Sequence, residues 1–145
     1  MLRAWWFCLA NGLVGFSTAF PTPVNASEMR YEQFRSALAR GAMPAIVIDF
    51  ARCRGDKAER GPPVMAVVRF NAYNLMSAYI ATSGTHLFEA ADGSMRLEYI
   101  RARFNPDDGV EFTLKQIDPA TYQAASPGAR YLCNLRDGSV LLEGP

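Results

Sequence analysis

The sequence predicts an α+β domain in which one N-terminal helix packs on an antiparallel, mainly meander β-sheet. An apolar stripe with helical spacing occurs near the start of the domain. The rest of the chain consists of short apolar or alternating runs, separated by turns rich in Gly, Pro, Asn and Asp. Residues 27–145 suffice for a single hydrophobic core, so we expect one β-rich domain there.

The first 26 residues have the layout of a cleavable secretory signal peptide. Arg3 is the one charged residue, an apolar stretch covers residues 4–20, and small residues follow. We expect cleavage after Ala26, with Ala19 as the second candidate site. The mature chain would then work outside the cytosol, in the periplasm or secreted.

A membrane anchor is the first rival to this interpretation. An anchor needs about 20 continuous apolar residues, and here Asn11-Gly12 interrupts the stretch and Pro21 ends it. The second rival, a lipoprotein, is disfavoured because Cys8 lies too early and follows bulky aromatic residues. We therefore expect no stable membrane insertion once the leader is removed.

Charge and motifs exclude several functions. The chain has 15 basic and 14 acidic residues without a block of one sign, so no basic face for nucleic acid is predicted. The Gly-x-Ser-x-Gly pattern and a Gly-rich phosphate loop are both absent from the sequence. The chain has a single His, and its cysteines lack the paired spacing of zinc sites. We predict no catalytic motif, no cofactor and no metal.

Two cysteines, Cys53 and Cys133, remain after removal of the leader. Cysteines of an exported chain usually pair, because the compartment is oxidising. A bridge would close most of the domain and contribute on the order of 4 kcal/mol. The alternative is a free nucleophilic thiol assisted by His86.

One helix is predicted over residues 31–40. Ser27 is a candidate N-cap, and Gly41 provides a left-handed stop. The helix would pack on the sheet through an apolar stripe formed by Tyr31, Phe34 and Leu38.

Strands follow this helix to the end of the chain. Turn signals at Ser83-Gly84, Asp92-Gly93, Asn105–Gly109, Ser126–Gly128 and Asp137-Gly138 separate several of them. The strands are expected at residues 45–50, 64–70, 72–82, 85–89, 95–104, 110–115, 131–135 and 140–142.

Two segments carry further expectations. Within residues 95–104 the apolar positions change from odd to even numbers, which predicts a β-bulge. Residues 54–63 are charged and rich in Gly and Pro, so we expect a long, exposed and mobile loop.

Few residues suggest chemistry. Asp49 lies within an apolar strand, His86 is a candidate general base, and Glu98 offers a further carboxylate. For each, an ordinary structural position is the simpler interpretation. Several aromatic residues could line a ligand cup or pack in the core, with the core favoured: Tyr73, Tyr79, Phe88, Tyr99, Phe104 and Phe112.

Besides the helix ending at Gly41, the mature chain contains a series of short motifs: Ile46-Val47-Ile48-Asp49 with Cys53, Asn71-Ala72-Tyr73, Thr85-His86-Leu87-Phe88, Asp92-Gly93, Glu98-Tyr99-Ile100-Arg101 and Asn105–Val110. In these motifs and their order, the chain resembles the VirK family of small exported bacterial proteins. The family takes its name from the virulence regulon of plant-tumour-inducing bacteria, which implies an accessory role near a host. It implies no established enzymatic activity or catalytic residue. Within these motifs we keep Asp49, His86, Glu98 and Arg101 as candidate functional residues.

Three functions follow as hypotheses. The first is a non-enzymatic exported module that binds an unidentified protein or small molecule, and it predicts an exposed apolar groove. The second is a small exported hydrolase, which predicts that Asp49, His86 and Glu98 meet in one cleft. The third is an inhibitor-like envelope protein that presents residues 54–63 to a partner.

Overall fold

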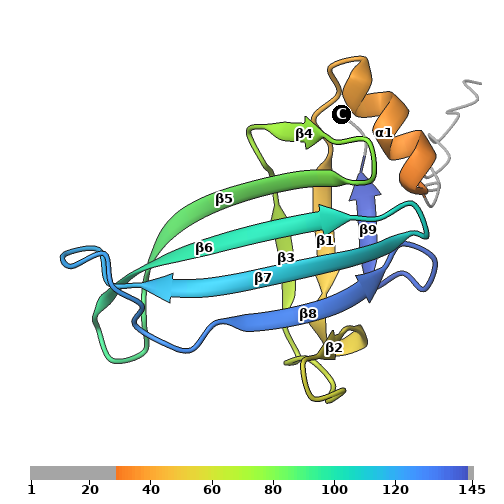
Figure 1. Ribbon diagram of the computed structural model, residues 1–145. Helices are drawn as coiled ribbons and strands as arrows, with labels where there is room; N and C mark the ends of the chain where they lie inside the picture. Colours follow the sequence, from red (N-terminus) through yellow and green to blue (C-terminus); the bar gives the residue numbers. More distant parts are fainter. Residues whose placement is uncertain (1–28, 144–145) are drawn as a thin grey trace, which may run out of the picture.

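The computed structural model describes residues 29–143 and confirms the α+β class (Figure 1). One helix precedes two antiparallel sheets. The elements are α1 (Tyr31–Ala39), β1 (Ala45–Asp49), the 3-10 turn η1 (Phe50–Arg52), β2 (Arg54–Gly55), β3 (Met65–Val68), β4 (Tyr73–Leu75), β5 (Ile80–Glu89), β6 (Met95–Phe104), β7 (Gly109–Ile117), β8 (Ala129–Asn134) and β9 (Val140–Glu143).

Helix α1 forms where the apolar stripe predicts it. Tyr31 and Phe34 are buried, and Gly41 has a φ of +85°, the left-handed stop expected after the helix. The N-cap position is Arg30, whose backbone N–H donates to the Gln33 side chain at 3.0 Å. Ser27, the predicted cap, lies outside the described residues.

The larger sheet has six strands in the order β2-β8-β7-β6-β5-β4. Strands β4 to β8 follow one another in the sequence and in the sheet, so the predicted meander is confirmed. The turn at Asn105–Gly109 joins β6 to β7 as expected.

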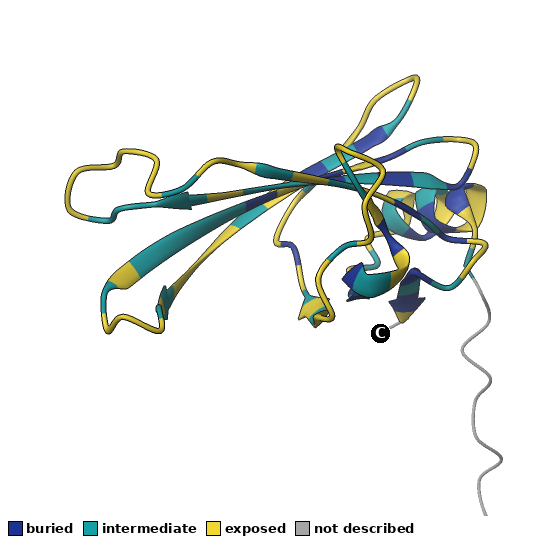
Figure 2. Ribbon diagram, turned by 90° about the horizontal axis from the view of Figure 1, so that it is seen from below, coloured by how far each residue is buried: buried dark blue, intermediate teal, exposed yellow. Residues whose placement is uncertain are grey.

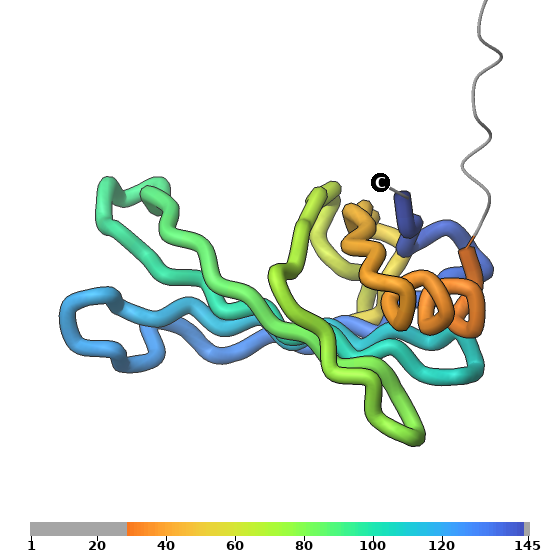
Figure 3. The backbone as a smooth tube through the Cα atoms, turned by 90° about the horizontal axis from the view of Figure 1, so that it is seen from above, coloured from red at the N-terminus to blue at the C-terminus, as the bar shows by residue number. Residues whose placement is uncertain are grey.

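A second sheet of three strands, in the order β3-β1-β9, was not foreseen. Its strands cross those of the larger sheet (Figure 1). The small sheet and α1 cover the same face of the larger sheet, at one end only (Figure 3). The other end of β5 to β8 extends beyond this cover (Figure 2).

The core lies between the covering layer and the inner face of the larger sheet. Phe34 of α1 packs against Phe104 with ring centroids 4.8 Å apart, and Ile46 and Ile48 of β1 are fully buried. Phe112 of β7 completes this cluster. Burial of such large apolar side chains is the main stabilising term of the fold.

Cys53 and Cys133 form the predicted disulfide, which links the end of η1 to β8 across 80 residues of sequence. Both residues are buried. The alternative of a free nucleophilic thiol at either position is therefore wrong.

The prediction of one strand over residues 72–82 and a turn at Ser83-Gly84 is wrong. The chain turns earlier, at Met76–Tyr79, where the Met76 N–H donates to the Tyr79 carbonyl at 3.0 Å. Strand β5 then passes straight through Gly84. Gly84 allows the Phe70 ring to pack closely against the backbone of β5, because a Cβ there would lie 3.3 Å from that ring.

The predicted β-bulge in residues 95–104 is also wrong. Strand β6 pairs with β5 and β7 in unbroken register from end to end. Even-numbered residues face inward throughout, but only Ile100, Ala102 and Phe104 lie under the covering layer. The pattern changes because Arg96 and Glu98 extend beyond that layer, which leaves polar residues on the inner face.

The segment 54–63 is mostly an exposed loop, as predicted, but it begins with a short strand. Arg54 and Gly55 pair with Leu132 and Tyr131 of β8. The adjacent disulfide explains this pairing, because Cys53 is held beside Cys133 and the chain leaves it along β8.

Candidate functional site

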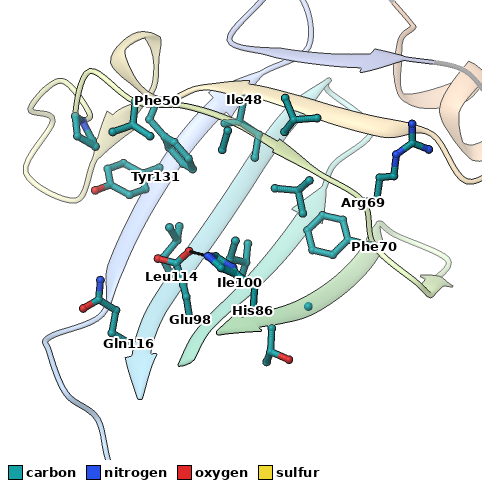
Figure 4. A pocket seen from close by; sticks show the side chains of 17 residues that line it. Ile48, Phe50, Arg69, Phe70, His86, Glu98, Ile100, Leu114, Gln116 and Tyr131 are labelled. Carbon is teal, nitrogen blue, oxygen red and sulfur yellow. Dashed lines mark ion pairs between the residues drawn. The ribbon is translucent and has the colours of Figure 1, made fainter. Parts of the chain in front are cut away.

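An open cleft of about 750 Å³ lies where the small sheet ends above the larger one. Strands β1 and β3 form one wall, and the inner faces of β5 to β8 form the other (Figure 4). This volume lies in the range of small-ligand sites. The exposed apolar groove expected of a binding module is therefore present.

The inner part of the cleft is apolar. Phe50 and Tyr131 lie at one end with ring centroids 5.0 Å apart, and Phe70 lies toward the other (Figure 4). Gly84 exposes backbone here, beside the Phe70 ring. Between these ends the walls are aliphatic, formed by Ile48, Val64, Ala66, Val68, Ile100 and Leu114.

A row of polar side chains crosses the inner face at the mouth of the cleft. His86, Glu98 and Gln116 are direct cross-strand neighbours on β5, β6 and β7. The Nε2 of His86 lies 3.6 Å from the Oε2 of Glu98, and the two side chains are 54% and 18% exposed. These atoms form an ion pair only when the imidazole is protonated.

The structure brings together two of the four candidate residues. Asp49 does not line the cleft; it accepts a hydrogen bond of 3.1 Å from the Ala51 N–H and so caps η1. Arg101 is exposed on β6 and, with its odd number, lies on the face opposite Glu98. The expected meeting of Asp49 with His86 and Glu98 is therefore wrong.

The aromatic residues of the cleft are not those that the sequence suggested. Tyr73, Phe104 and Phe112 belong to the core or pack against it, as favoured. The lining rings, Phe50, Phe70 and Tyr131, come from segments with no ligand-binding signal. Only pairing of distant strands brings them together, so sequence patterns alone could not have found them.

Comparison with known proteins identifies the family. The model of the VirK family, described as "VirK protein", matches residues 28–122. The chain belongs to the VirK family. The sequence resemblance is thereby confirmed.

Two individual proteins are similar to this chain. The uncharacterized protein y4wH of Sinorhizobium fredii (strain NBRC 101917 / NGR234) is 22% identical over 130 residues, covering 85% of this chain and 90% of the relative. The crystal structure of lpg1832, a VirK family protein from Legionella pneumophila, aligns with a TM-score of 0.65 at 14% identity. That alignment covers 73% of this chain and 89% of lpg1832, and it shows a shared fold.

The described part of this VirK chain lacks two further features. Residues 29–143 contain no helix long and apolar enough to cross a membrane. The same residues contain no group of three or more His, Cys, Asp or Glu side chains arranged to hold a metal ion. The arrangement that they do present is an apolar cleft with a polar row at its mouth.

Proposed function

We propose that this VirK chain is an exported, non-enzymatic accessory protein that binds a ligand in the cleft between its two sheets. The single observation that carries the proposal is the cleft of about 750 Å³ with apolar walls and a polar mouth. Apolar walls provide affinity through burial, and a few polar groups orient the ligand. The proposal assigns this accessory role to a virulence regulon of plant-associated bacteria, which the family resemblance supports.

Two further features support export to the periplasm or beyond. Residues 1–26 have the pattern of a signal peptide, and the family model matches only from residue 28. The disulfide between Cys53 and Cys133 is compatible with an oxidising compartment. Fractionation of cells expressing the full chain, followed by intact-mass measurement, tests this part. A periplasmic species that begins at Ser27 supports it; uncleaved chain in the cytosol contradicts it.

Binding is tested with the apolar dye N-phenyl-1-naphthylamine, whose fluorescence rises when it leaves water. Ala66 faces the cleft from β3, so Ala66→Phe fills part of the cavity and is expected to weaken dye binding by about tenfold. Ala81 is the matched control, because it lies on β5 outside the cleft. Equal dye binding by Ala66→Phe and Ala81→Phe, or no binding by the wild type, would contradict the proposal.

A hydrolase is the second candidate, and the pairing of His86 with Glu98 in the cleft is the observation that favours it. A panel of p-nitrophenyl esters of increasing acyl length provides the test. Turnover that disappears in both His86→Asn and Glu98→Gln would support an enzyme. The ligand-binding proposal expects no turnover above that of buffer.

A further inference from the structure

Strand β3 has a free edge beside the cleft. It pairs with β1 on one side, and among the described residues no strand pairs with its other side. Such an edge presents backbone N–H and C=O groups that are available for pairing with another extended chain. The cleft is lined by residues of this same strand, so the edge and the cleft form one continuous surface.

The alternation of the ladder identifies the free backbone groups. The Phe50 N–H donates to the Val64 carbonyl at 3.0 Å, so the backbone carbonyl of Val64 points toward β1. In an antiparallel pair every second residue does so, which directs the backbone of Ala66 and Val68 toward β1 as well. The N–H and C=O groups of Met65 and Val67 therefore point to the free edge. No hydrogen bond joins them to any described residue.

The surface below this edge has room for another strand. The row of His86, Glu98 and Gln116 crosses β5, β6 and β7, as β3 itself does (Figures 1 and 4). The neighbouring row of Gly84, Ile100 and Leu114 lies deeper in the cleft. A strand added to β3 would lie above these two rows and would cover the part of the inner face that the small sheet leaves open.

We propose that the ligand of the cleft is an extended polypeptide segment that pairs with β3 as a fourth strand of the small sheet. This inference rests on the proposed function and names the chemical class of the ligand. The free backbone groups of Met65 and Val67 bind its main chain, and the cleft takes its inward-facing side chains. A small apolar molecule would use the cleft but leave the four backbone groups of this edge without partners.

The side chains around the edge define the composition of the segment. Met65 and Val67 are 69% and 66% exposed, an apolar rim that suits apolar residues on the outer face of the added strand. Arg69 also lines the cleft, is exposed, and forms no ion pair with a described residue, whereas Glu98 lies against His86. Charge complementarity therefore calls for an acidic residue at the end of the segment that lies beside Arg69. In the more stable antiparallel pairing this is the N-terminal end.

The experiment selects peptides from a phage-displayed library of random dodecapeptides on the mature, oxidised chain. The strongest peptide is then synthesised with a fluorescent label. Val67→Pro removes one edge donor without touching the β1–β3 ladder, because the Val67 N–H points away from β1. Val67→Thr is the matched control, which keeps the donor and the β-branched shape. We expect about tenfold weaker binding by Val67→Pro and at most about twofold weaker binding by Val67→Thr, which loses one apolar contact of the rim but keeps the donor.

Two measurements do not depend on the folding of Val67→Pro. Amide hydrogen exchange of the wild-type chain is expected to slow about tenfold at Met65 and Val67 when the peptide saturates the protein. Arg69→Gln is expected to weaken a selected acidic peptide several-fold and to leave an uncharged analogue unaffected.

The outcomes separate this inference from the proposed function. Peptides that bind Val67→Pro as tightly as wild type, or that leave the two amides unprotected, overturn the inference. If no peptide is selected but the apolar dye still binds, the inference fails and the ligand-binding function stands; if neither binds, both fail. A dimer of the chain that Val67→Pro dissociates would make a second copy the occupant and would also overturn the inference.

Discussion

The carboxylate of Asp108 accepts a hydrogen bond of 2.9 Å from the backbone N–H of Tyr31, 77 residues earlier in the chain. This bond fixes the first turn of α1 to the hairpin between β6 and β7. The side chain of Asp108 is 4% exposed, and the guanidinium of Arg136 donates to it at 2.6 Å. Arg30 adds a second positive charge at 3.8 Å. A buried carboxylate thus holds the covering helix on the sheet.

Replacing this carboxylate by a neutral group should destabilise the fold in a pH-dependent manner. Burial raises the pKa of Asp108, but the bonds from the Tyr31 N–H and Arg136 outweigh it, so the pKa lies below its usual value. The resulting stabilisation is complete above about pH 4 and is lost as the pH falls through the folded-state pKa. Asp108→Asn should therefore cost about 1–3 kcal/mol at pH 7 and much less at pH 2.

Urea unfolding of both proteins between pH 7 and pH 2 measures this difference. Asparagine tolerates the φ of +67° at position 108, so the backbone of the turn is retained. Asp107→Asn is the control, because Asp107 is exposed and bonds only within the turn, to the Gly109 N–H. A cost of Asp108→Asn that stays constant with pH would contradict the explanation.

This same turn shows what a sequence can and cannot predict. The residues Asn105–Gly109 carry local turn chemistry, so the hairpin was predictable without any tertiary information. The bond from Asp108 to Tyr31 depends on how a distant helix packs. The small sheet depends likewise on pairing of β1 with β3 and β9, and no local pattern separates these strands from the larger sheet.

In the candidate site, too, local chemistry was predictable from the sequence and long-range packing was not. His86 and Glu98 were candidates because of their chemistry alone, and no sequence pattern assigned Glu98 to the inner face. It faces inward because β6 extends beyond the covering layer, which only the three-dimensional arrangement reveals. Asp49 was a candidate with an ordinary structural position as the simpler interpretation, and its oxygen does have a structural role, since it caps the turn that follows β1.

Loss of the disulfide should lower the stability of the protein by about 2–5 kcal/mol. The bridge between Cys53 and Cys133 closes a loop of 80 residues and also anchors η1, which carries Phe50 into the cleft wall. Urea unfolding of the double variant Cys53→Ala, Cys133→Ala, compared with the oxidised wild type, measures the cost. The reduced wild type should match the double variant. Equal stability of all three would contradict a structural role for the bridge.

Gly61 should tolerate no side chain. A Cβ at this position would overlap the carbonyl oxygen of Phe50 and lie 2.9 Å from its carbonyl carbon, so the backbone would have to move. We expect Gly61→Ala to cost about 2 kcal/mol or more in unfolding free energy and to weaken dye binding in the cleft, since Phe50 lines it. Gly55→Ala is the matched control, because a Cβ there would make only an ordinary contact of 3.7 Å. Equal thermal stability of the two variants would contradict this close approach.

Tyr73 should make the protein sensitive to alkaline pH. Its hydroxyl is buried without a hydrogen-bond partner among the described residues, and burial raises its pKa to about 12. The unfolded chain releases this proton near pH 10, so the folded state loses relative stability as the pH rises from about 10 to 12. Because the ring is only partly buried, we expect a loss below about 2 kcal/mol.

Tyr73→Phe should remove this loss and should not destabilise the protein at pH 7, because it deletes a buried hydroxyl that makes no hydrogen bond within residues 29–143. Tyr122→Phe is the control, since it removes the hydroxyl of a tyrosine that is 78% exposed. Urea unfolding at pH 7, 10 and 11.5 compares the three proteins. If Tyr73→Phe loses as much stability at high pH as the wild type, another group causes the alkaline sensitivity. If Tyr73→Phe is destabilised at pH 7, the Tyr73 hydroxyl has a hydrogen-bond partner in solution.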